Sequence, residues 1–150
     1  YFIYGDTMYK YYVFKIKTEY VKITRNNVGF LYDTFNIFRK SSIKDFCTVF
    51  SFFDLLTGKI SKKILNTFLF PCFDFDGYQR NNNIHSYYDY FSKEKSILVI
   101  NDRYLIIESN KKDNIFINRL RYIPNLFLCD FSSNIYFYLD TYSINTCLIS

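Results

Sequence analysis

Lysine and arginine side chains alternate with aromatic side chains in the first part of the sequence, most clearly from Tyr9 to Arg25. Cations bind the phosphates of a nucleic acid, and unpaired bases stack on tyrosine, phenylalanine and arginine planes. The same pattern also suits a solvated strand face in an aromatic-rich protein. The residues predicted to contact RNA are Lys10, Lys15, Lys17, Lys22, Arg25, Arg39, Lys40, Lys44, Lys62, Lys63 and Arg121.

The residues that catalysis or metal binding would need are sparse. A serine or cysteine nucleophile needs a neighbouring base, and the single histidine, His85, lies in an asparagine-rich segment that we expect to be a surface loop. Asp74 and Asp76 could hold a divalent cation, but an Asp-Gly turn explains the same residues. Gly58-Lys59 lacks the glycine and the hydroxyl of a phosphate-binding loop. We therefore expect no enzyme activity, no cofactor, no metal and no small-molecule substrate.

Four cysteines are widely spaced, and each lies among apolar neighbours. Zinc sites usually have two ligands close together in the sequence, and no pair of these cysteines does. We predict buried free thiols, with a disulfide or a metal site as the alternative. The cysteines are Cys47, Cys72, Cys129 and Cys147.

Positive charge is concentrated in the first half of the chain. The net charge is +5 over 150 residues, but residues 1–63 carry +6 and residues 64–150 carry −1. This asymmetry predicts that one side of the protein faces a polyanion.

Aromatic residues make up 23% of the sequence, with 18 Phe, 16 Tyr and no Trp. Strongly A+T-biased codons would produce such a composition, so we expect an organellar genome rather than a functional demand for aromatic rings. No apolar stretch reaches the roughly 18 residues of a membrane span, and no secretory signal is visible. We therefore expect no membrane span.

The apolar pattern divides the chain at about residue 40. Residues 1–40 are predicted as a basic extended arm or strands, since apolar and polar residues alternate there. Residues 41–150 are predicted as an α/β domain, with one globular domain overall. Within it, a helix before Gly58, a helical turn at Ser86–Phe91 and a strand at Ser96–Ile100 are expected.

The pattern in the last third of the sequence predicts a strand, a short helix, a strand, a helix and a strand. Short apolar runs indicate buried strands, Asn114 or Asp113 caps the first helix, and Ser133 or Asn134 caps the second. Alternating units of this length predict a mostly parallel sheet flanked by helices, a Rossmann-like open sheet. The three strands are expected at Leu105–Ile107, Leu126–Cys129 and Ile144–Ile149, and the helices between them at 114–123 and 134–142.

In this region the sequence resembles the universal large-subunit ribosomal protein L-four family. Members of that family have an Arg-Asn-(Ile/Leu)-Pro-Asn turn, matched here at 121–125 with Tyr122 in place of Asn. Their last helix reads Asn-Val-Tyr-Asp-(Leu/Val)-Leu-(Lys/Arg)-Tyr-Asp, matched at 134–142 with Phe137 in place of the first Asp. The similarity runs without gaps over residues 105–150. The long Gly- and Arg-rich loop of the family has no counterpart in the sequence.

The resemblance implies a structural constituent of a large ribosomal subunit that binds ribosomal RNA and neighbouring ribosomal proteins during translation. With the composition, it implies a mitochondrial ribosome in the matrix, or alternatively a relict plastid. Arg121 would mainly orient its turn. The alternative hypothesis is a protein-interaction subunit of another organelle-encoded respiratory or membrane-associated assembly.

Overall fold

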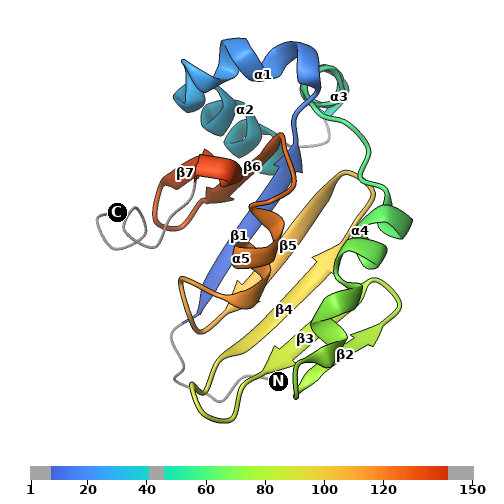
Figure 1. Ribbon diagram of the computed structural model, residues 1–150. Coiled ribbons are helices and arrows are strands. Elements are labelled where there is room, and N and C mark those ends of the chain that lie inside the picture. Colours follow the sequence, from blue (N-terminus) through green and yellow to red (C-terminus); the bar gives the residue numbers. More distant parts are fainter. Residues whose placement is uncertain (1–7, 41–45, 142–150) are drawn as a thin grey trace.

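The computed structural model describes residues 8–40 and 46–141, and its centre is a seven-stranded sheet (Figure 1). The strands are ordered β2-β3-β4-β5-β1-β6-β7, and every neighbouring pair is antiparallel. Their bounds are β1 Tyr9–Lys15, β2 Tyr78–Asn81, β3 Ile84–Tyr88, β4 Lys95–Ile100, β5 Tyr104–Ser109, β6 Leu126–Asp130 and β7 Ile135–Tyr138.

The prediction of a mostly parallel, Rossmann-like sheet is therefore wrong. Strands β5 and β6 do flank a helix, and they point in the same direction because both pair antiparallel with β1. They are not neighbours, however, since β1 lies between them and supplies the ladder hydrogen bonds of both. A strand from the start of the chain thus turns a predicted parallel pair into two antiparallel pairs.

Helices cover both faces of the sheet (Figure 1). Side chains of β1 alternate between two cores, so that Val13 packs with α4 and α5 while Phe14 packs with α2 and α3. The helical elements are α1 Thr18–Arg25, α2 Val28–Lys40, α3 Phe46–Leu56, α4 Lys62–Phe68, η1 Phe70–Asp74, α5 Ile115–Leu120 and η2 Leu139–Thr141.

Within residues 8–40, the predicted extended segment is a strand only in β1. Strand β1 matches the predicted alternation, but α1 and α2 replace the extended arm expected up to residue 40. Tyr20, Val21 and Thr24 of α1 contact the core beneath them at helical spacing. The alternating pattern of the strand ran directly into this helical pattern, which hid the boundary.

The C-terminal third follows the prediction up to β6 and then departs from it. Asn114 caps α5 by accepting from the N–H groups of Phe116 and Ile117, at 3.1 Å each. The predicted helix from Asn134 is instead strand β7, because Asn134 has φ 54° and closes a hairpin with β6. The strand predicted at 144–149 lies outside the described residues.

The predictions for the middle of the chain were partly right. The helical turn predicted at Ser86–Phe91 is wrong, since the first half of that segment belongs to strand β3 and the rest forms a non-helical turn. The strand predicted at Ser96–Ile100 is confirmed as β4, and the helix before Gly58 is confirmed as α3.

One face of the sheet is only partly covered. Helices α1, α2 and α3 pack on β1, β6 and β7, while the same face of β3, β4 and β5 carries half-buried or exposed apolar residues. We call this the open sheet face; its central row, which is in register across the strands, is Ile84, Val99, Ile106 and Tyr12.

Candidate nucleic-acid interface

Three distant segments meet where β1 ends. Residue Ile16 forms an isolated bridge with Thr57, and Gly58 N–H donates to the Lys15 carbonyl over 2.9 Å. The Ile60 N–H donates over 2.7 Å to the carbonyl of Asp102, in the β4–β5 turn. These bonds hold the segment between α3 and α4 against the end of β1 and place their lysines together.

The lysines at this junction continue along α4. Ser61 caps α4 by accepting from Ile64 N–H over 3.2 Å, so Lys62 and Lys63 lie in the first turn. We call the resulting set the α4 basic surface. It consists of Lys15 at the end of β1, Lys17 just after it, Lys59 in the α3–α4 segment, Lys62 and Lys63 of α4, and Arg80 of β2, which lines a cleft with Lys63.

Helix α4 lies between two surface clefts, and each is lined by at least one cation of this surface. The smaller, about 80 Å³, is lined by Lys15 together with Ser61, Ile64 and other apolar residues of β5, β6 and the α5–β6 turn. The larger, about 340 Å³, is lined by Lys63, Asn66, Thr67, Phe70 and Arg80. Thus α4 is flanked by positive charge on both sides, from Lys15 of β1 and from its own Lys63 with Arg80.

Carboxylates are scarce on the α4 basic surface. Lys62 forms an ion pair with Asp102 at 3.0 Å, and Arg80 donates from Nε to the Asn82 carbonyl over 2.7 Å. Within residues 8–40 and 46–141, none of the other cations of this surface forms an ion pair. Most of its charge is therefore available to an anionic partner.

Arg80 and Lys59 were not among the residues predicted to contact RNA. Arg80 reaches the surface only because β2 places it beside α4, and no local sequence signal marks that neighbourhood. Lys59 follows Gly58 at the end of the predicted helix, and its charge alone could have marked it.

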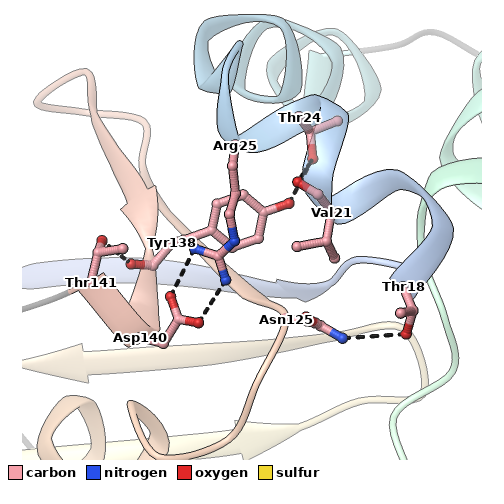
Figure 2. A network of polar contacts seen from close by, with 8 residues as sticks. All are labelled: Thr18, Val21, Thr24, Arg25, Asn125, Tyr138, Asp140 and Thr141. Carbon is pink, nitrogen blue, oxygen red and sulfur yellow. Dashed lines mark hydrogen bonds and ion pairs between the residues drawn. The ribbon is translucent and has the colours of Figure 1, made fainter.

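Arg25 is already engaged within the protein (Figure 2). Its guanidinium donates to both carboxylate oxygens of Asp140, at 3.0 and 2.6 Å, and lies 4.2 Å from the centre of the Tyr138 ring. These hydrogen bonds raise the pKa of Arg25. The buried Thr24 and Tyr138 hydroxyls are bonded at 2.7 Å beside it. Arg25 thus fastens α1 to the end of β7.

The other predicted cations do not join the α4 basic surface. Lys22 and Lys40 are exposed at α1 and at the end of α2, and Lys44 lies outside the described residues. Arg121 is the C-cap residue of α5, where its guanidinium donates to the Tyr122 hydroxyl over 3.2 Å. The structure therefore brings together Lys15, Lys17, Lys62 and Lys63 and separates the rest.

Lys10 and Arg39 lie at the edge of the open sheet face. The ammonium of Lys10 is 5.4 Å from the centre of the Tyr12 ring, and the Arg39 guanidinium is 4.8 Å from that of Phe131. Both side chains are exposed, so they form a second, separate group of cations.

The expectation that His85 lies in a surface loop is wrong. His85 is fully buried on β3, where Nδ1 is 2.8 Å from the Tyr78 hydroxyl and Nε2 is 2.7 Å from Asn66 Oδ1. Burial, and to a smaller extent the charge of Arg80, lowers the pKa of His85 to about 4. The ring is neutral at neutral pH and joins β3 to β2 and α4.

The remaining candidates for chemistry behave as ordinary surface or core residues. Asp74 and Asp76 are exposed, and Asp76-Gly77 forms the predicted turn. Cys72 and Cys129 are buried free thiols whose pKa values are raised by burial. Cys47 and Cys147 lie where no side chain is described. No group of three or more potential metal ligands occurs among the described residues.

Neither the protein-family models nor the curated proteins contain a match to this sequence. In the described part of the chain, every helix is too short or too polar to cross a membrane.

Proposed function

We propose that this protein binds RNA as a non-catalytic structural component of a ribonucleoprotein particle. The observation that carries the proposal is the α4 basic surface. Lysines from β1, the α3–α4 segment and α4 meet Arg80 there, and among the described residues Lys62 is the member that pairs with a carboxylate, that of Asp102.

The geometry suits a phosphate backbone better than a compact ligand. The cations lie on either side of a short helix rather than around one cavity, and each lysine acts as a flexible point charge. Phe70 lines the larger cleft with 66% of its surface exposed, so a base flanking a bound phosphate would have a ring to stack on.

Placement in the large subunit of an organellar ribosome is the more specific part of the proposal. It rests on the composition and on the motifs at 121–125 and 134–142. The sheet that the resemblance implies is mostly parallel, whereas the sheet here is antiparallel, so the structure lends that resemblance no support. The proposed RNA binding depends on the α4 basic surface and not on that resemblance.

RNA binding is tested with the full chain and a double-stranded RNA of defined length. We expect binding to weaken steeply with salt, since each neutralised phosphate contributes a slope of about −0.9 to a plot of log K against log salt concentration. The variant Lys59→Gln/Lys63→Gln should bind more weakly and with a slope shallower by about 2. The control Lys93→Gln/Lys111→Gln removes the same charge from exposed lysines at the other end of the sheet and should match the original protein.

A protein-interaction subunit is the second candidate, favoured by apolar side chains on the outer surfaces of three helices. They are Ile23 of α1, Phe30 and Ile37 of α2, and Phe52 and Leu55 of α3, all 43% exposed or more.

Cosedimentation of the native protein with large-subunit RNA supports the ribosomal proposal. Migration in an RNA-free complex, together with salt-insensitive or absent RNA binding in vitro, supports this candidate instead.

A further inference from the structure

A cleft of about 230 Å³ opens where α2 ends above the sheet, and almost every residue that lines it is aromatic. It lies at the boundary between the covered part of the sheet and the open sheet face. The lining residues are Tyr12, Phe14, Phe35, Phe38, Arg39, Tyr104 and Phe131.

The floor of this aromatic cleft is rigid. Phe14 and Phe35 are almost fully buried and stack with their ring centres 4.1 Å apart and their planes at 18°. Both rings also pack edge-on against Phe53 of α3. A ligand entering the cleft would therefore meet a preformed surface rather than having to create one.

The walls of the cleft are rings that remain half-buried. The Tyr12 ring centre is 6.0 Å from that of Tyr104 and 5.4 Å from that of Phe131, at interplanar angles of 40° and 56°. Phe131 is also stacked on Tyr32 at 5.4 Å, which fixes its orientation. These rings present flat faces at the cleft rather than a close-packed interior.

Positive charge flanks the cleft on two sides. Arg39 lies over Phe131 and Lys10 lies over Tyr12, so a cation sits beside each of two walls. No carboxylate lines the cleft among the described residues. A flat, π-rich ligand attached to anionic groups would complement both the rings and the charges.

The volume narrows the class of ligand. Sites for drug-sized molecules usually measure about 300–1,000 Å³, so this cleft has room for one small ring system. Beyond Tyr12, the apolar row of the open sheet face continues through Ile106 and Val99. A second flat group of the same ligand could lie on this row.

We infer that the aromatic cleft binds one unpaired base of single-stranded RNA, with Arg39 and Lys10 holding the phosphates on either side of that base. The inference rests on the proposed function and adds to it a second contact that recognises single strands. The α4 basic surface, by contrast, engages the phosphate backbone of paired or unpaired RNA.

The test uses the full chain with two RNA probes of equal length. One is a single strand of uridines with a central 2-aminopurine, whose fluorescence is quenched on stacking, and the other is a perfect duplex. The variant Phe131→Leu removes the flat ring but keeps an apolar side chain. Phe30→Leu is the matched control, because Phe30 is an exposed ring of α2 outside the cleft.

We expect Phe131→Leu to weaken binding of the single strand by about fivefold or more and to relieve the quenching. Duplex binding should be unchanged, and Phe30→Leu should bind both probes as the original protein does. Arg39→Gln should weaken single-strand binding without relieving the quenching fully. Circular dichroism spectra and unfolding midpoints identify any variant that has lost its fold, in which case Tyr104→Leu provides the same readout.

Unchanged single-strand affinity and quenching in folded Phe131→Leu and Tyr104→Leu would overturn the base-binding inference, even where duplex binding persists. Loss of binding to both the single strand and the duplex in these variants would also overturn the base-binding inference, since the cleft would then lack selectivity for unpaired bases. Failure of the original protein to bind either probe would instead refute the proposed function itself.

Discussion

Acidification should destabilise this protein through one residue, His85. The protein has a single histidine, so between pH 7 and pH 5 few other side chains titrate. In the folded state the ring is fully buried, with Tyr78 and Asn66 on its two nitrogens and the cation Arg80 nearby, and its pKa falls from 6.5 to about 4. The neutral ring satisfies both partners, because Nε2 can donate to Asn66 Oδ1 while Nδ1 accepts from the Tyr78 hydroxyl.

The sign and size of the effect follow from linkage. Because the pKa is lower in the folded state, the unfolded chain takes up the proton first, so stability is complete above about pH 6.5 and falls as the pH drops. With pKa values of 6.5 and about 4, the free energy of unfolding should fall by about 2 kcal/mol between pH 7 and pH 5. The loss stops growing below about pH 4, where the folded state binds the proton as well.

Urea unfolding followed by circular dichroism at pH 7, 6 and 5 measures this loss. At an m-value of about 2 kcal/mol/M, the midpoint should shift by about 1 M. The control is His85→Asn, which is less stable throughout but has no ring to protonate. Half-buried Glu94 has a raised pKa and acts in the opposite direction, but it is present in both proteins and cancels in the comparison.

Parallel pH profiles for the two proteins would refute this reasoning. So would an imidazole proton resonance that titrates near pH 6.5 in the folded protein, since it would mean that the ring reaches solvent.

Three further predictions concern the fold. Asn114→Ala should lower the free energy of unfolding by about 1 kcal/mol, measured in urea, and Asn114→Ser should restore most of it, because only a side-chain acceptor caps α5. Gly77→Ala should lower the thermal midpoint by several degrees, since Gly77 has φ 85° and a Cβ there overlaps a backbone carbonyl, whereas Gly29→Ala should be neutral or stabilising. Tyr138→Phe should cost about 1 kcal/mol in urea by leaving the buried Thr24 hydroxyl without that partner.

Elements with a local chemical signal were predictable from the sequence. The cap at Asn114 and the apolar runs of β4, β5 and β6 need no information from distant residues, and each lies where its pattern predicts it. The prediction for β7 failed because Ile135–Tyr138 is apolar or aromatic at every position. A strand pattern with a period of two and a helical pattern fit this segment equally well. The positive φ of Asn134, which closes the hairpin, leaves no unambiguous mark in the sequence.

The candidate site was only partly predictable, for a reason that also explains the error in the sheet. Four lysines of the α4 basic surface were named from composition, but Arg80 joins them through the pairing of β2 with β3 and its position beside α4. Likewise, whether β5 and β6 pair with each other or with a third strand depends on where β1 inserts, more than 80 residues earlier in the chain. Hydrophobic runs identify strands that need covering without specifying their neighbours. Once β1 lies between β5 and β6, its end meets the segment after α3, and the bridge between Ile16 and Thr57 brings the lysines together there. The antiparallel sheet and the basic surface are therefore consequences of one non-local pairing.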